Sequence, residues 1–179
     1  MSKDWPTSKA ERESLEIKGF IQAYGRLPSG RHFEVVDKSE KPDYIVRDIS
    51  SGEIFGIELT SVYKDDRSVP DEHIPSHEGM VDIPYDQKEL DDYLDRLADS
   101  VRDKIVKARN GYDISNPLIL SVYVNEYISI FIRERDLKEM VNRHPGVFDD
   151  ISPFLEVVFW PPFGDGSVFH IPPSFYRGV

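Results

Sequence analysis

Two carboxylates stand out because each lies within a short apolar run. Asp43 opens the run 43–46 directly after Pro42, and Glu58 lies in the middle of the run 54–63. A carboxylate buried alone in such surroundings costs several kcal/mol unless it is ion-paired, hydrogen-bonded or bound to a metal. The types and positions of these two residues therefore indicate either a metal site or buried ion pairs.

The two runs are predicted to form adjacent antiparallel strands. Segment 48–53 (DISSGE) between them is rich in turn residues, and Gly52 supplies the positive φ that a hairpin requires. Because strand residues alternate between faces, Gly56 and Glu58 share one face, and Gly56 is expected to leave room for a ligand or ion. Two alternatives stay open: a salt bridge from Glu58 to an arginine such as Arg47, or an edge strand with a solvent-exposed Glu58 face.

Composition and length favour a soluble protein with one domain spanning 1–179. The sequence has 31% charged residues and no cysteine, and its first residues lack a signal-peptide core, so a cytoplasmic location without disulfides is expected. The net charge of −11 argues against a protein that coats nucleic acid nonspecifically, but it allows an enzyme with a local basic patch. A flexible tail is predicted for 1–7 and an irregular tail for 161–179.

Helical and strand periodicity predict the elements that must position the two acids. A capping box at Ser8 begins a helix over 9–24, and a continuous apolar stripe that ends at Val106 marks a long helix over 87–110. Segment 127–132 is expected to extend or pair with the strand before it. The other predicted elements are strands over 32–37, 118–124 and 154–160 and a helix over 134–143.

Two acids on the first predicted helix could reach the sheet. Glu13 lies one turn before Ile17 on the apolar line of the helix, and Glu16 flanks that line. The alternative explanation is an acidic first turn favoured by the helix dipole. The sequence leaves open which of these glutamates faces the sheet.

The segment 64–86 is predicted to be a long solvated loop. It contains the string DEHIPSHE, whose histidines and acids are of metal-ligating types. The spacing is not that of a helical HExxH motif, and Pro75 is incompatible with the helix which that motif needs. We therefore do not assign a metal site to this loop.

The order of elements, with Pro42-Asp43 opening one strand and Glu58 within the next, resembles the PD-(D/E)xK nuclease-like superfamily. That resemblance implies a restriction-endonuclease-like α/β core, a mixed sheet of at least four strands flanked by helices. It implies that Asp43, Glu58 and the carbonyl of Leu59 bind Mg²⁺ or Mn²⁺, with Glu13 or Glu16 as the first-helix acid. The implied activity is hydrolysis of phosphodiester bonds in DNA, by an endonuclease or exonuclease.

The sequence departs from the family pattern at the lysine that should follow Glu58 by two residues. Thr60 stands there instead. Loss of one such electrostatic group typically costs on the order of a hundredfold in rate. Lys88 and Lys104, both on the long predicted helix, are the candidate substitutes, whereas Lys64 lies further along the strand.

Two functions remain open at this stage. The first is a metal-dependent nuclease, and the second is a catalytically inactive nuclease fold that binds a protein partner or regulates one. A homodimer is compatible with either, and no apolar run is long enough to suggest a membrane partner. Basic residues of the second half of the chain either contact DNA phosphates or form solvated helix faces. They are Arg102, Lys104, Lys107, Arg109, Arg133, Arg135, Lys138 and Arg143.

Overall fold

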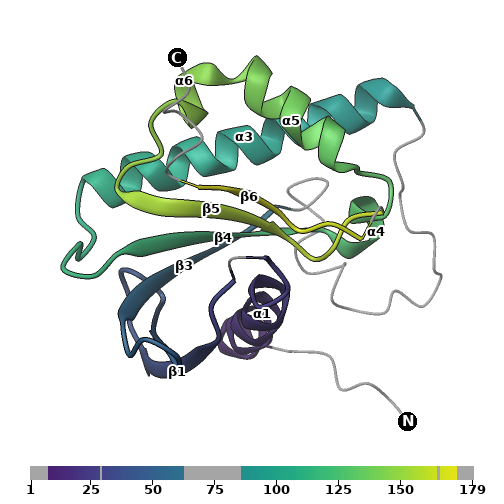
Figure 1. Ribbon diagram of the computed structural model, residues 1–179. Helices are drawn as coiled ribbons and strands as arrows, with labels where there is room; N and C mark the ends of the chain where they lie inside the picture. Colours follow the sequence, from purple (N-terminus) through teal and green to yellow (C-terminus); the bar gives the residue numbers. More distant parts are fainter. Residues whose placement is uncertain (1–7, 29, 63–85, 165, 173–179) are drawn as a thin grey trace, which may run out of the picture.

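The protein is an α/β molecule with a six-stranded mixed sheet between layers of helices (Figure 1). The computed structural model describes residues 8–28, 30–62, 86–164 and 166–172. The strands are β1 (Phe33–Lys38), β2 (Tyr44–Asp48), β3 (Ile54–Val62), β4 (Leu118–Val124), β5 (Phe154–Trp160) and β6 (Phe169–Ile171). The predicted class, a mixed sheet of at least four strands flanked by helices, is confirmed.

The strands lie in the sheet in the same order as in the sequence. β1, β2 and β3 form an antiparallel meander, β3, β4 and β5 run parallel, and β6 pairs antiparallel with β5. The β2–β3 turn follows the prediction, because Gly52 has a φ of +76°. The crossover from β3 to β4 includes α3, as a parallel connection requires.

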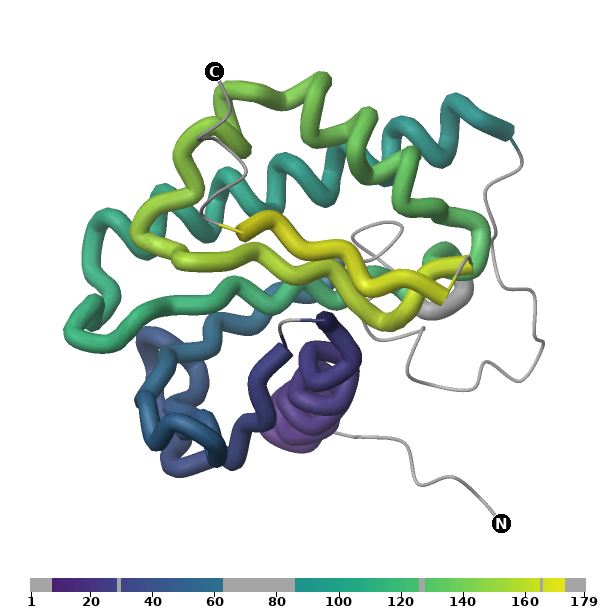
Figure 2. The backbone as a smooth tube through the Cα atoms, viewed as in Figure 1, coloured from purple at the N-terminus to yellow at the C-terminus, as the bar shows by residue number. Residues whose placement is uncertain are grey.

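The helices divide between the two faces of the sheet. They are α1 (Lys9–Tyr24), α3 (Gln87–Arg109), α4 (Glu126–Ser129), α5 (Glu134–Arg143) and α6 (Pro145–Phe148). α1 covers one face, and α3, α5 and α6 lie over the other (Figure 1). In Figure 2 the purple-to-blue part of the chain, α1 to β3, lies below the teal-to-yellow part, α3 to β6.

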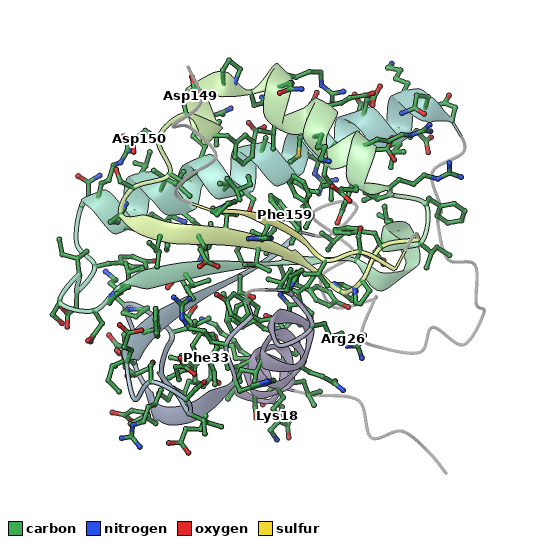
Figure 3. All side chains as sticks on the ribbon, in the orientation of Figure 1. Lys18, Arg26, Phe33, Asp149, Asp150 and Phe159 are labelled. Atoms are coloured by element: carbon green, nitrogen blue, oxygen red, sulfur yellow. The ribbon has the colours of Figure 1, made fainter. Side chains whose placement is uncertain are left out.

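The sheet separates two apolar cores. One lies under α1 and includes Phe20, Phe33 and Trp160, and the other lies under α3 and α5 and includes Leu97 and Phe159. Figure 3 shows Phe33 and Phe159 inside the molecule on opposite sides of the sheet. β3 contributes to both cores, so its alternate side chains point toward α1 and toward α3.

The helix ends follow the sequence signals. Ser8 Oγ accepts a hydrogen bond from the Glu11 amide at 3.3 Å, and the Glu11 carboxylate accepts one from the Ser8 amide at 3.0 Å, which confirms the capping box. Asp86 caps α3 by accepting from the Glu89 amide. Val106, which we assigned to the buried stripe of α3, is instead 51% exposed.

Three local predictions were wrong or incomplete. Segment 127–132 does not extend or pair with β4, because Asn125 caps a short helix there and its side chain accepts from the Ile128 amide at 3.3 Å. The tail that begins at residue 161 is not wholly irregular, since β6 adds an antiparallel edge to β5. The helix α6 was not anticipated. The loop predicted for 64–86 lies outside the described residues except for Asp86, as does the tail 1–7.

Candidate active site at the edge of β3

Asp43 is fixed where β3 extends beyond its neighbour β2. The β2–β3 pairing begins with Tyr44 opposite Ile57, so β3 continues past the end of β2. The carboxylate of Asp43 accepts a hydrogen bond from the Leu59 amide at 2.8 Å. A side chain thus replaces the backbone partner that a longer β2 would provide, and it holds the Asp43 carboxylate against the edge of β3.

Glu58 is buried on the face of β3 that meets α3. The residue is 2% exposed, and its Oε1 accepts hydrogen bonds from Lys104 Nζ and from the Tyr112 hydroxyl, each at 2.5 Å. Its Oε2 is buried and has no hydrogen-bond partner among the described residues. Leaving a buried acceptor unsatisfied costs about 1–3 kcal/mol, and more when the group is charged. A cation bound at this oxygen would therefore be favourable.

Lys104 reaches Glu58 because of its place on α3. It lies between buried Val101 and buried Ala108 in helical spacing, so its aliphatic stem follows the helix face that packs on the sheet. One turn earlier, Ser100 Oγ lies 3.1 Å from Thr60 Oγ1. These two contacts align α3 with the Glu58–Thr60 face of β3.

The first-helix acids approach β3 from the other side of the sheet. Glu16 accepts a hydrogen bond from the Ser61 hydroxyl at 2.7 Å. Glu13 pairs with Lys38 of β1 at 2.8 Å and with Lys9 at 3.4 Å. The sequence left open which of the two glutamates faces the sheet, and in the structure both contact residues of the sheet.

These groups surround a cleft of about 290 Å³. The cleft is lined by residues of α1, of β3, of α3 and by Asp43, which directly precedes β2. Four separate segments must therefore fold before the cleft exists. The lining residues are Lys9, Arg12, Glu13, Glu16, Asp43, Leu59, Thr60, Ser61 and Lys104.

The crowding of acids changes their proton affinity. Burial and the neighbouring charge of Glu58 raise the pKa of Asp43 to about 6, although the Leu59 amide and Lys104 act in the opposite direction. Burial also raises the pKa of Glu16. Burial would raise the pKa of Glu13 too, but hydrogen bonding and the charge of Lys38 outweigh it, and the pKa of Glu13 is lowered.

The structure brings together most of the site residues predicted from the sequence. Asp43, Glu13, Glu16, Thr60 and Lys104 line the cleft, and Glu58 lies behind it. Lys88 does not join them, because it is exposed in the first turn of α3, a helical rise of about 24 Å from Lys104.

The space beside Gly56, which we predicted to hold a ligand or ion, is filled by the protein itself. A Cβ at this position would lie 2.5 Å from Pro42 Cγ and 2.6 Å from Leu118 Cδ2. The missing side chain therefore accommodates Pro42, which precedes Asp43, and it does not leave room for a ligand.

Of the two alternatives considered for Glu58, the salt bridge is correct in kind but not in its partner, and the solvent-exposed face is wrong. Arg47 pairs with Glu34 at 2.9 Å, so it is not the partner of Glu58. The burial of Glu58 excludes a solvent-exposed face. An ion pair does exist, but its cation is Lys104.

The cations of the cleft differ from those expected for DNA contacts. Of the eight predicted basic residues only Lys104 lines the cleft. Five others pair with acids that do not line the cleft, the residues being Arg102, Arg109, Arg135, Lys138 and Arg143. Lys9 and Arg12 line the cleft instead, and they lie four residues before Glu13 and Glu16, a spacing that places them on the same helix face.

Tyr112, like Lys9 and Arg12, is a residue of the site that the sequence analysis did not predict. It follows the end of α3, and its amide donates to the Ala108 carbonyl at 3.2 Å. Nothing in its sequence neighbourhood distinguishes it from a loop tyrosine, because its role depends on the packing of α3 against β3.

The donors present fit a hard divalent cation. Within the described ranges no three histidine or acidic side chains cluster closely enough to hold a metal by themselves. Mg²⁺ does not require such a cluster, since it is usually held by one or two carboxylates together with water and substrate oxygens. The N–H and C=O of one strand residue point to the same side, so the Leu59 carbonyl is directed toward the Asp43 edge like its amide.

The chain matches no protein-family model, no curated protein and no solved structure. Among the described helices, none is long and apolar enough to cross a membrane.

Proposed function

We propose that the protein is a metal-dependent nuclease with a restriction-endonuclease-like core that hydrolyses phosphodiester bonds in DNA. The observation that carries this proposal is the arrangement of Asp43, Glu58 and Lys104 at the overhanging edge of β3. The buried, unpartnered Oε2 of Glu58 supports it, because it is an acceptor that no described residue satisfies.

In this proposal Asp43, Glu58 and the Leu59 carbonyl hold Mg²⁺ or Mn²⁺. The bound ion supplies a Lewis acid that lowers the pKa of an attacking water and neutralises charge on the phosphate. The protein's contribution is rigidity: the Leu59 amide fixes Asp43, and Lys104 and Tyr112 fix Glu58. Glu16, tied to Ser61, adds a third acid at the cleft wall.

Lys104 is proposed to replace the motif lysine that is missing at Thr60. It reaches the same face of β3 from α3, its ammonium group bonds to Glu58, and Lys104 is among the residues that line the cleft. An ammonium group beside the scissile phosphate would offset the charge that develops in the transition state. Thr60 in turn contacts Ser100 and so helps to align α3 with β3.

Lys9 and Arg12 are proposed to bind DNA phosphates. They line the cleft from α1, whereas Lys104 lines it from α3, so cations flank the acids from both helical layers. Arg12 can bind a phosphate through two parallel hydrogen bonds. The local cations matter because the net charge of −11 opposes binding of a polyanion elsewhere on the surface.

One observation favours the second function, an inactive nuclease fold that binds or regulates a protein. Lys104 already neutralises Glu58, and Tyr112 adds a hydrogen bond to the same oxygen. A buried acid with these two partners can be purely structural. Metal binding distinguishes the two functions.

The test is calorimetric titration of Mg²⁺ and Mn²⁺ into the wild type and into an Asp43→Asn, Glu58→Gln double variant. We expect the wild type to bind, the double variant not to bind, and only the wild type to cleave plasmid and linear DNA. Asp136→Asn is the control, since Asp136 is a buried acid outside the cleft lining. No binding by the folded wild type would overturn the proposal and favour the protein-binding function.

A further inference from the structure

The carboxylate of Glu58 is held asymmetrically. Both donors, Lys104 and Tyr112, bond to Oε1, and no described residue bonds to Oε2. Two donors on one oxygen fix the plane of the carboxylate as well as its position. Only Oε2 is then left to accept a further partner.

Tyr112 is held firmly in the position from which it donates to Glu58 Oε1. Its ring packs against the core under α3, and its amide closes the end of that helix on Ala108. The hydroxyl group is therefore positioned by the backbone and by packing before any ion binds. Lys104 has a longer and more flexible side chain, so Tyr112 is the more rigid of the two donors.

A carboxylate that offers one oxygen discriminates between cations. Ca²⁺ takes six to eight oxygen ligands and accepts bidentate carboxylates, whereas Mg²⁺ is smaller and requires near-octahedral geometry with single oxygens. Occupying Oε1 blocks bidentate ligation by Glu58. This restriction disfavours Ca²⁺ more than it disfavours Mg²⁺.

We infer that Tyr112 is a positioning residue that, with Lys104, makes Glu58 a one-oxygen ligand and so selects Mg²⁺ over Ca²⁺. The inference rests on the proposed function, because it assumes that Glu58 binds the ion. It adds a residue and a selectivity that neither the sequence nor the proposed nuclease activity implies.

The test compares the dissociation constants for Mg²⁺ and Ca²⁺ in the wild type and in Tyr112→Phe, measured by calorimetry without substrate. Removing the hydroxyl leaves Lys104, the more flexible donor, alone on Oε1, so Oε1 shares in ligation more readily. We expect the ratio of the Ca²⁺ to the Mg²⁺ dissociation constant to fall about tenfold, a change of the size that metal affinity typically shows when a partner of a metal ligand is lost. The ratio is informative because a general loss of structure would weaken both ions alike.

Tyr24→Phe is the matched control. The Tyr24 hydroxyl also donates to a carboxylate, that of Glu156 at 2.8 Å, but neither residue lines the cleft. We expect this variant to keep the wild-type ratio. An unchanged ratio in Tyr112→Phe, or equal weakening of both ions, would overturn the inference while leaving the proposed function intact.

Failure of the proposed function gives a different result. In that case the wild type binds neither ion, and the Asp43→Asn, Glu58→Gln double variant behaves identically. The inference about Tyr112 then fails with it. Binding by the wild type that survives in the double variant would place the ion elsewhere and would also reject both.

Discussion

Asp43 couples the stability of the protein to pH. Its pKa is raised to about 6 from an ordinary value near 3.8, so the folded protein ionises this group less readily than the unfolded chain does. The protonated group therefore contributes stability that is fully present below about pH 4 and is lost as the pH rises through about 6. Asparagine avoids this loss and keeps an oxygen that can accept from the Leu59 amide.

We expect Asp43→Asn to be more stable than the metal-free wild type at pH 7.5 and nearly equal to it at pH 4. Urea unfolding at the two pH values, with a chelator present, measures the difference. Added Mg²⁺ should stabilise only the wild type. A variant less stable than the wild type at pH 7.5 would show that the Asp43 charge is satisfied without a metal.

Lys104 stabilises the buried charge of Glu58. Removing one partner of a buried ion pair leaves an uncompensated charge, at a typical cost of 3–5 kcal/mol, and the partial exposure of Lys104 places the expected loss near the lower end, about 3 kcal/mol. We expect this loss of unfolding free energy in Lys104→Met, measured by urea unfolding without metal. Lys104→Met combined with Glu58→Gln should recover most of it, and a double variant no better than the single would contradict the coupling.

At the scale of elements, Gly56 connects the packing of the sheet to the position of Asp43. A methyl group at this position would press on Pro42 and Leu118, both of which are enclosed by the fold. Overpacking of this kind costs about 1–3 kcal/mol, and here the displaced Pro42 carries Asp43 with it.

We therefore expect Gly56→Ala to lower the free energy of unfolding by about 1–3 kcal/mol and also to weaken Mg²⁺ binding. Chemical unfolding and calorimetry give the two quantities. Gly111→Ala is the matched control, because a Cβ at Gly111 meets no atom within 4 Å. Unchanged Mg²⁺ affinity in a destabilised Gly56→Ala would show that Pro42 does not position the metal site.

The elements most accessible from the sequence were those with strong periodicity and clear caps. The stripe of α3, the Ser8 capping box and the Gly52 turn each depend on residues close together in the chain. β6 was missed because it exists only through its pairing with β5. α4 was missed although its cap, Asn125, is a local signal, because the short apolar run that follows Asn125 fits a strand as well as a helix.

The site residues divide in the same way, into those that local sequence identifies and those that only the fold identifies. Asp43 and Glu58 were identifiable as acids in apolar runs, and the structure adds how each is held. The choice of Lys104 over Lys88 depends on how α3 crosses β3, which periodicity does not specify. Tyr112 contributes through packing between distant segments, so its sequence neighbourhood carries no corresponding signal.

At the scale of the whole molecule, the net charge limits how DNA would bind in the proposed function. The net charge of −11 opposes binding of a polyanion, so among the described residues we expect the phosphate contacts to be made by the cations that line the cleft, Lys9, Arg12 and Lys104. Three contacts release few counterions, and we expect a plot of log affinity against log salt concentration to have a slope of about −3.

Fluorescence anisotropy of a labelled duplex without divalent cations measures this slope. Arg12→Ala should make it shallower by about one unit, whereas Arg102→Ala should not change it, because Arg102 pairs with Asp99 outside the cleft. A steep slope that Arg12→Ala leaves unchanged would place the DNA on another surface.

The bond from the Leu59 amide to Asp43 gives the protein an internal spectroscopic reporter. Because the partner of this backbone amide is a titrating side chain and not a neighbouring strand, its proton resonance should follow the charge of the carboxylate. Protonation of Asp43, or a cation that withdraws its electron density, would shift this single peak in an amide spectrum. The Leu59 resonance therefore makes the state of the site observable without substrate or turnover.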